Sequence, residues 1–173
     1  MLSPLVASFT SSLPKITVDR TLGFEHPGIR LAMEHWNALR GQRKMPSRQE
    51  LRPAAMRRFL RFVNLVDVEP GTGIYRVSLQ SAHTAELFGQ IAHRKFGELF
   101  APEVAQRWRD CFNLVRDGGE PVRLQSEVGS EGQFWRRCEV FIAPLSETPD
   151  EERLTSLFWA FASWARDETI AVA

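Results

Sequence analysis

The stretch from Leu154 to Trp164 constrains the fold most, because it predicts a β-strand that is apolar on both faces. Side chains alternate across a strand, and the apolar ones here form two sets, Leu157, Trp159 and Phe161 against Phe158, Ala160 and Ala162. Such a strand is usually central in its sheet or covered on its second face by another element. We therefore expect packed structure on both sides of it. The stretch is also far too short to cross a bilayer, which takes about 20 residues.

Four more strands are predicted earlier in the chain, in two groups separated by helices. Alternating apolar and polar residues or β-branched runs mark them at 62–69, 74–79, 122–128 and 134–142. Apolar residues at helical spacing mark two longer helices, at 27–39 and 102–117, and short helical pieces lie near 83–88 and 96–99. A hairpin turn at 70–73 joins the first two strands. Five antiparallel strands interrupted by helices predict an α+β fold.

The composition fits one folded domain and hides an uneven distribution of charge. With 43% hydrophobic and 25% charged residues, the 173-residue chain is too apolar and too balanced in charge for a mostly disordered protein. The net charge of +1 conceals eight cationic residues and one acid between residues 40 and 61, against 14 cationic and 20 acidic residues elsewhere. Two distant cysteines, with no secretory signal and no disulfide framework, predict a cytoplasmic location without membrane insertion.

A set of short motifs gives the narrowest indication of the fold. They run from a Trp-x-x-Leu-Arg-Gly helix end through a Pro-Ser-Arg element into the first strand and on to later turns: Trp36, Leu39–Gly41, Met45–Arg48, Pro53, Tyr75–Val77, Phe88–Gly89, Gly118–Pro121 and Pro144–Leu145. With these motifs the chain resembles the PAS fold over residues 27–164, and more narrowly a family of short bacterial single-PAS proteins. It departs from that family at Gln80 and His93, where a glycine is usual.

The resemblance implies a PAS-like α+β fold: a five-stranded antiparallel sheet with helices on one face and an N-terminal helical extension. It divides the chain into a flexible N-terminal arm at 1–25, the helical extension at 26–60, a PAS core at 61–165 and a C-terminal tail at 166–173. It also implies a cavity between helices and sheet that can hold a small molecule. The N-terminal helix and the outer sheet face of such domains commonly mediate dimerisation or partner docking.

Five residues are candidates for contact with a ligand in such a cavity: His83, Phe88, His93, Trp108 and Phe112. The two histidines flank the short helices that face the cavity in a PAS fold, and a haem-binding PAS domain would take its proximal histidine from this region. The favoured interpretation of both is a surface or hydrogen-bonded histidine beside a helix end. The cofactor stays unknown, and no histidine or cysteine spacing is typical of a zinc site.

Five apolar residues are candidates for docking a second copy or a partner protein: Ile29, Met33, Trp36, Trp135 and Phe141. The first three lie on one face of helix 27–39, which cannot belong to the sheet, so this face packs either on the same domain or on a second copy. On the strand 134–142 the other two alternate with Arg137 and Glu139. This mixture of apolar and charged side chains predicts a half-exposed docking surface.

The basic segment holds its cationic side chains within 22 positions of the chain: Arg40, Arg43, Lys44, Arg48, Arg52, Arg57, Arg58 and Arg61. One interpretation is a site for an anionic nucleotide, a nucleic acid or an acidic protein. The favoured one is a set of structural ion pairs and helix-end contacts with a solvated remainder. Direct binding of nucleic acid is not expected, because no helix-turn-helix or RNA-binding motif accompanies the charge.

The sequence and the resemblance together predict a PAS-type sensory or regulatory module. It would bind a small ligand, a signalling partner or both, form a homodimer, and carry neither an effector domain nor a catalytic activity of its own. One alternative is a ligand-free adaptor that docks an acidic partner through residues 40–61. A second is a small enzyme with a hydrophobic pocket, for which no acid–base pair can be identified.

Overall fold

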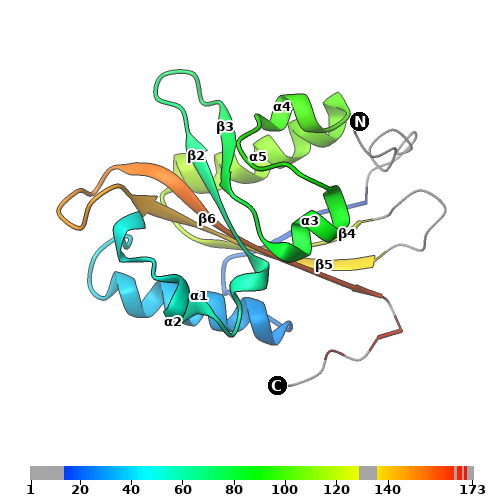
Figure 1. Cartoon of the computed structure of the whole chain (residues 1–173), viewed down its shortest axis with the longest axis horizontal. Helices are drawn as coiled ribbons and strands as arrows, with labels where there is room; N and C mark the ends of the chain where they lie inside the picture. The colour runs from blue at the N-terminus through cyan, green and yellow to red at the C-terminus, as the bar shows by residue number, and fades with distance from the viewer. Residues whose placement is uncertain (1–13, 129–135, 166, 169, 171–173) are drawn as a thin grey trace.

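A computed structural model of the chain describes residues 14–128 and 136–165, together with 167, 168 and 170. Within these residues the chain forms an antiparallel sheet of six strands in the order β1-β4-β5-β6-β2-β3 (Figure 1). The strands are β1 (Thr17–Asp19), β2 (Val63–Val68), β3 (Tyr75–Leu79), β4 (Val122–Val128), β5 (Arg136–Ser146) and β6 (Leu154–Ala165). The predicted antiparallel α+β fold is therefore confirmed.

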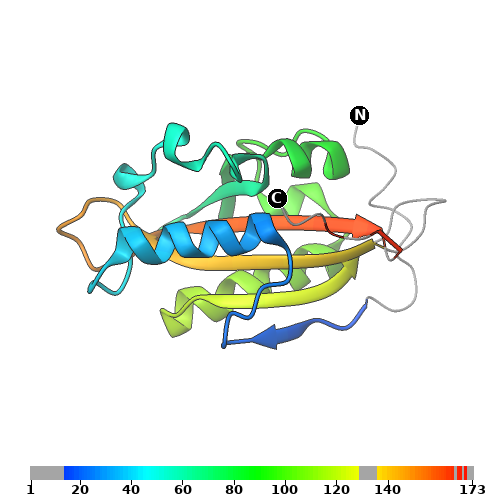
Figure 2. The same ribbon diagram turned by 90° about the horizontal axis from the view of Figure 1, so that it is seen from below.

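Helices cover both faces of this sheet (Figures 1 and 2). They are α1 (Pro27–Arg40), α2 (Pro53–Met56), α3 (Ala82–Phe88), α4 (Phe96–Leu99) and α5 (Pro102–Gly118), with 3-10 turns at Arg48–Glu50 and Leu60–Phe62. We call the face under α3, α4 and α5 the inner face, and the face under α1 the outer face. The two faces carry separate hydrophobic cores.

Strand β6 lies between β5 and β2 and contributes to both cores, as its pattern predicts. Its inward side chains are Leu157, Trp159 and Phe161, and its outward ones are Phe158, Ala160 and Ala162. All six are fully buried. The second face of β6 is covered by the chain's own helix α1, so the outer core is intramolecular.

Helix α1 is bounded by residues that suit its ends. The His26 side chain caps the start by accepting a hydrogen bond from the Gly28 backbone N–H at 3.1 Å. Gly41 ends the helix with φ of +57°, a backbone conformation that glycine adopts without a steric penalty. Between them Trp36 is fully buried, and its indole N–H donates to the Pro144 carbonyl at 3.0 Å. This bond fixes α1 across the outer face.

The sixth strand comes from the segment that the sequence assigns to a loose arm. Strand β1 pairs with β4 from Thr17 opposite Gln125 to Asp19 opposite Arg123. Its three residues are too few to show a strand period in the sequence, and its position is fixed by the contact between Asp19 and Arg123 at 3.1 Å. Among the described residues, no helix is both long enough and apolar enough to cross a membrane.

Candidate functional site

The inner core is dominated by aromatic rings between the helices and the sheet, where the resemblance implies a ligand cavity. We call this set the aromatic cluster: Tyr75, Phe88, Phe96, Phe100, Trp108, Phe112, Trp159 and Phe161. The ring centroids of Trp108 and Trp159 are 5.1 Å apart, and those of Phe96 and Phe112 are 4.9 Å apart. These separations are those of rings in direct contact.

Local sequence periods bring these rings together. Trp108 and Phe112 are four residues apart on α5, so both point from one helix face toward the sheet. Trp159 and Phe161 are two residues apart on β6, so both point from the sheet toward α5. The short helices α3 and α4 begin or end at two further members, Phe88 and Phe96. The site is therefore shared between three helices, the central strand β6 and, through Tyr75, the start of β3.

The aromatic cluster contains one buried polar atom that lacks a conventional partner. Trp159 is fully buried, and its indole N–H finds no hydrogen-bond acceptor among the described residues. The rings of Trp108, Phe96 and Phe112 stand at steep angles to it, and an aromatic face accepts a hydrogen bond only weakly. A buried donor without an acceptor costs about 1–3 kcal/mol. An acceptor atom from a small molecule would remove this cost.

Three of the five predicted ligand residues, Phe88, Trp108 and Phe112, meet in the aromatic cluster. His83 lies at its border, where its ring is 5.8 Å from that of Phe161. The His83 Nε2 atom accepts the Ser163 backbone N–H at 2.9 Å. This lone pair is already engaged, so His83 does not fit the part of an axial haem ligand.

His93 lies apart from the aromatic cluster, and its contact with a ligand stays a prediction. Its side chain is exposed, and its backbone has φ of +65°. Its N–H donates to the Val77 carbonyl at 2.6 Å, and its own carbonyl accepts from Arg76 at 3.0 Å. His93 therefore covers the edge of β3. The sequence could not indicate this, because the role belongs to the backbone.

Burial lowers the pKa of His83 to about 4, and the nearby Arg61 guanidinium acts in the same direction. The folded state thus holds His83 neutral, whereas in the unfolded chain a histidine titrates near 6.5. The stability from this group is complete above pH 6.5 and is lost as the pH falls from 6.5 toward 4.

We expect the free energy of unfolding to fall by about 1–2 kcal/mol between pH 7 and pH 5 through His83, allowing for its partial exposure. Urea denaturation across this range would measure it. In His83→Gln, which keeps an acceptor but does not titrate, the pH dependence should be clearly shallower. An identical slope in both proteins would contradict this assignment.

The predicted docking residues lie mostly inside the molecule. Ile29, Trp36 and Phe141 are fully buried in the outer core, and Met33 packs at its margin. For the three buried residues the docking prediction is wrong, because the apolar face of α1 packs on the sheet of its own domain. Trp135 lies outside the described residues.

A buried charge cluster on the outer face was not expected from the sequence, which places Glu139 on a half-exposed surface. Glu139 is fully buried. Its carboxylate accepts from the backbone N–H groups of Glu25 and His26 at 3.0 and 2.8 Å. It also accepts a hydrogen bond from the Arg123 Nε–H at 2.8 Å, and the Arg123 Nη2 atom lies 2.7 Å from the same oxygen as an ion pair. Arg123 reaches on to Asp19, so the cluster fastens β1 and the start of α1 to the sheet.

Most of the basic segment is engaged within the chain. Three cations form ion pairs: Arg43 with Glu50 at 2.7 Å, Lys44 with Glu152 at 3.8 Å and Arg61 with Glu86 at 3.6 Å. Arg48 pairs with Asp67 and also donates to the Ser78 hydroxyl at 3.0 Å. The Arg40 guanidinium lies over the Trp36 ring, 5.1 Å from its centroid. Among the described residues, Arg52, Arg57 and Arg58 are exposed and have no ion pair. The contacts support the structural interpretation of this segment.

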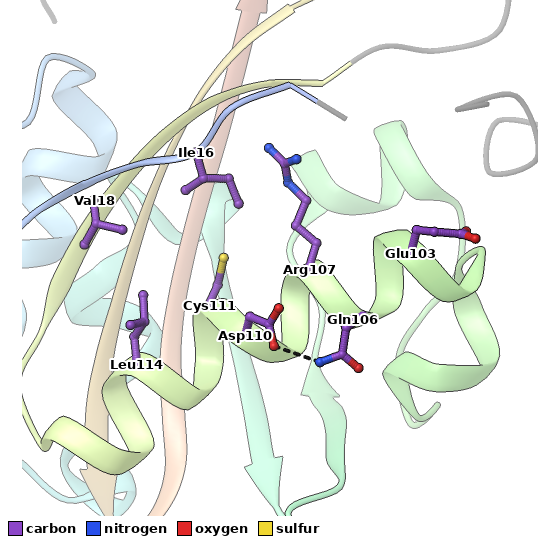
Figure 3. Close-up of a pocket in the computed structure, with 8 residues that line it drawn as sticks. All are labelled: Ile16, Val18, Glu103, Gln106, Arg107, Asp110, Cys111 and Leu114. Carbon is purple, nitrogen blue, oxygen red and sulfur yellow. Dashed lines mark hydrogen bonds between the residues drawn. The ribbon is translucent and has the colours of Figure 1, made fainter. Parts of the chain in front are cut away.

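A second feature that the sequence did not indicate is an open pocket between β1 and α5. Its volume is about 560 Å³. Figure 3 shows the lining residues: Ile16, just before β1, and Val18, within it, on one side, and on α5 Glu103, Gln106, Arg107, Asp110, Cys111 and Leu114. We call this pocket the β1–α5 groove. It depends on β1 joining the sheet, so no local pattern in the chain could mark it.

Comparison with known proteins bears on the family of this chain. No curated protein matches it. A solved structure described as "Flavin Analogue Sheds Light on Light-Oxygen-Voltage Domain Mechanism" is similar with a TM-score of 0.42 and 15% identity, over 61% of this chain and 78% of that one. The family model for the PAS domain matches residues 24–158, which span the outer helix, six of the eight residues of the aromatic cluster and most of the sheet. The chain therefore belongs to the PAS domain family.

Proposed function

We propose that this chain is a sensory PAS module that binds a small molecule within the aromatic cluster and passes the change on through protein contacts. Membership of the PAS family supports a sensory or regulatory role in general. The observation that carries the ligand proposal is the Trp159 indole N–H, which is buried among aromatic rings without an acceptor in the described residues. The proposed ligand is an apolar, planar molecule with one hydrogen-bond acceptor.

The helix that would move to admit a ligand is α3. Its start is held by the Asn64 side chain, whose oxygen accepts from the Ser81 N–H and the Thr84 hydroxyl, each at 2.7 Å. The segment beyond its end is held by the side chain of Gln80, which precedes the helix. This side chain donates to the Gly89 carbonyl at 2.6 Å and accepts from the Ile91 N–H at 3.0 Å. These bonds define two anchor points, between which α3 covers one side of the aromatic cluster.

The proposed mechanism is a shift between two populations. The rings pack against one another in the closed conformation, so a ligand would bind a conformation in which α3 has moved outward. A ligand shifts this equilibrium only by the difference between its affinities for the two conformations. We also propose a homodimer without catalytic activity, in the cytoplasm. The two free, buried cysteines support that location.

Native mass spectrometry of the purified protein, followed by denaturing extraction, tests the ligand proposal. We expect an additional mass on the protein and the release of a small molecule. Trp159→Phe should lower the bound fraction by about tenfold, because it removes the donor and retains an aromatic ring. A protein that carries no small molecule, and binds none from a metabolite extract, would refute the proposal.

The matched control is Trp164→Phe. Trp164 is on the same strand, but it points to the outer face, where its ring lies 5.6 Å from that of His26. This variant should retain the ligand content of the wild type. An equal loss in both variants would indicate a general effect on β6 and not a contact with the Trp159 N–H.

A further inference from the structure

The two edges of the sheet differ in whether their outward-facing backbone groups are hydrogen-bonded. At the β3 edge, the backbone of residues 93–95 covers the strand: the His93 N–H donates to the Val77 carbonyl at 2.6 Å, and the Val77 N–H donates to the Arg94 carbonyl at 3.2 Å. At the opposite edge, β1 pairs with β4 on one side. No described residue forms a backbone hydrogen bond with its other side. An open strand edge is a template for pairing with another strand.

The side chains along this edge sort by face. Ile16 and Val18 point to the inner face and line the β1–α5 groove (Figure 3). Val18 is 43% exposed, although it is a large apolar residue. The alternate residues Lys15, Thr17 and Asp19 belong to the outer face, since side chains alternate along a strand. The edge thus offers an apolar row on one face and a polar row with both signs of charge on the other.

We propose that β1 pairs antiparallel with β1 of a second copy, about a two-fold axis through Thr17, so that the two sheets become continuous. A two-fold axis normal to the sheet places the inner face of one copy beside the inner face of the other. Two facing residues therefore have their side chains on the same face, so their numbers are both odd or both even. With the axis at Thr17, Ile16 faces the second copy's Val18, and Lys15 faces its Asp19. The apolar row meets itself, and opposite charges face each other.

The neighbouring registers lack this match. An axis at Val18 would place Ile16 opposite Arg20 and Lys15 opposite Thr21, which separates the apolar pair and the charge pair. An axis at Ile16 would place Val18 opposite Pro14, which has no N–H to donate. The residues of the edge therefore select the register centred on Thr17, and with it a second copy of this chain as the occupant.

This pairing gives a geometry to the homodimer, and it rests on that part of the proposed function. It needs no ligand. A ligand-free dimer with the Thr17 register would support the pairing while refuting the ligand proposal, and a ligand-bound monomer would do the reverse. Native mass spectrometry reports both properties in one measurement.

A single cysteine tests the register directly. Facing residues of an antiparallel pair have Cα atoms about 4.5–5.5 Å apart, within the range of about 4.4–6.8 Å that a disulfide spans. Thr17→Cys should therefore form a covalent dimer under mild oxidation. Burial raises the pKa of Cys111 to about 11 and that of Cys138 to about 12, so the native thiols contribute little. Thr21→Cys, at an exposed position that faces no equivalent residue, should stay monomeric.

Sedimentation equilibrium tests the interface without a new thiol. Val18→Lys should raise the dissociation constant by at least about tenfold, because each copy then sets an ammonium against Ile16 of the other. Leu79→Lys is the matched control, since Leu79 is 40% exposed at the far edge of the sheet; it should dimerise like the wild type.

Three results would overturn the proposal. These are a wild type that stays monomeric at high concentration, a dimer that Val18→Lys leaves intact, and a covalent dimer that forms in Thr21→Cys but not in Thr17→Cys. If another protein or residues 1–13 occupied this edge, the first result would follow. The disulfide experiment remains decisive even if Val18→Lys does not fold.

Discussion

Replacing Glu139 with alanine is expected to lower the free energy of unfolding by about 3–5 kcal/mol, the cost of breaking a buried ion pair by removing one partner. The loss would leave the Arg123 guanidinium, whose side chain is 8% exposed, without its buried carboxylate. It would also leave the Glu25 and His26 N–H groups without an acceptor. Urea denaturation followed by tryptophan fluorescence measures this change.

The double variant Glu139→Leu with Arg123→Leu separates two costs: that of an unpaired buried charge, and that of losing the acceptor for the backbone N–H groups before α1. Removing both charges avoids the unpaired guanidinium, so the double variant should be more stable than Glu139→Ala alone. It should not reach the wild type, because the two backbone N–H groups still lack an acceptor. If Glu139→Ala unfolds at the wild-type urea concentration, the cluster does not hold the outer face in the way described.

Asn64→Leu is expected to cost about 2–4 kcal/mol, since it leaves several buried polar groups without a partner. Asn64 is fully buried in β2. Its oxygen accepts from Ser81 and Thr84, and its amide donates to the Trp159 carbonyl at 3.2 Å. Because this side chain is one of the two anchor points of α3, hydrogen exchange of the α3 amides should accelerate more than that of α5.

The matched control for this variant is Asn37→Leu. Asn37 lies on α1 and is half-buried, and its side chain donates to the Met33 sulfur at 3.0 Å. Its substitution should change the free energy of unfolding by less than about 1 kcal/mol. Equal losses in the two variants, or unchanged exchange in α3, would contradict the anchoring role of Asn64.

Elements with a local period were predictable from the sequence. The two apolar sets of β6 required cover on both faces, and both cores are present. The spacing of Trp108 and Phe112 placed two rings on one face of α5, and the rings meet there at 5.9 Å. In these cases each residue's environment depends on neighbours within one turn or two strand positions, so the pattern is visible in the sequence.

The outer face could not be predicted because its partners are far apart in the chain. Glu139 accepts hydrogen bonds from residues 113 and 114 positions away, and no local pattern marks such a pair. The same reason applies to Trp36, whose acceptor is the carbonyl of Pro144. The sequence left open whether its helix packs on this domain or on a second copy. The geometry of long-range contacts decided that question.

The position of β6 in both cores has a mechanical consequence. Trp159 presses on the aromatic rings of one layer, while its chain neighbours Phe158 and Ala160 support α1 in the other. Only the backbone of β6 separates the inner core from the outer core at this point. A rotation of the backbone at Trp159 would therefore also displace Phe158 and Ala160, on which α1 packs. A rearrangement of the inner rings would in this way change the position of α1 on the outer face.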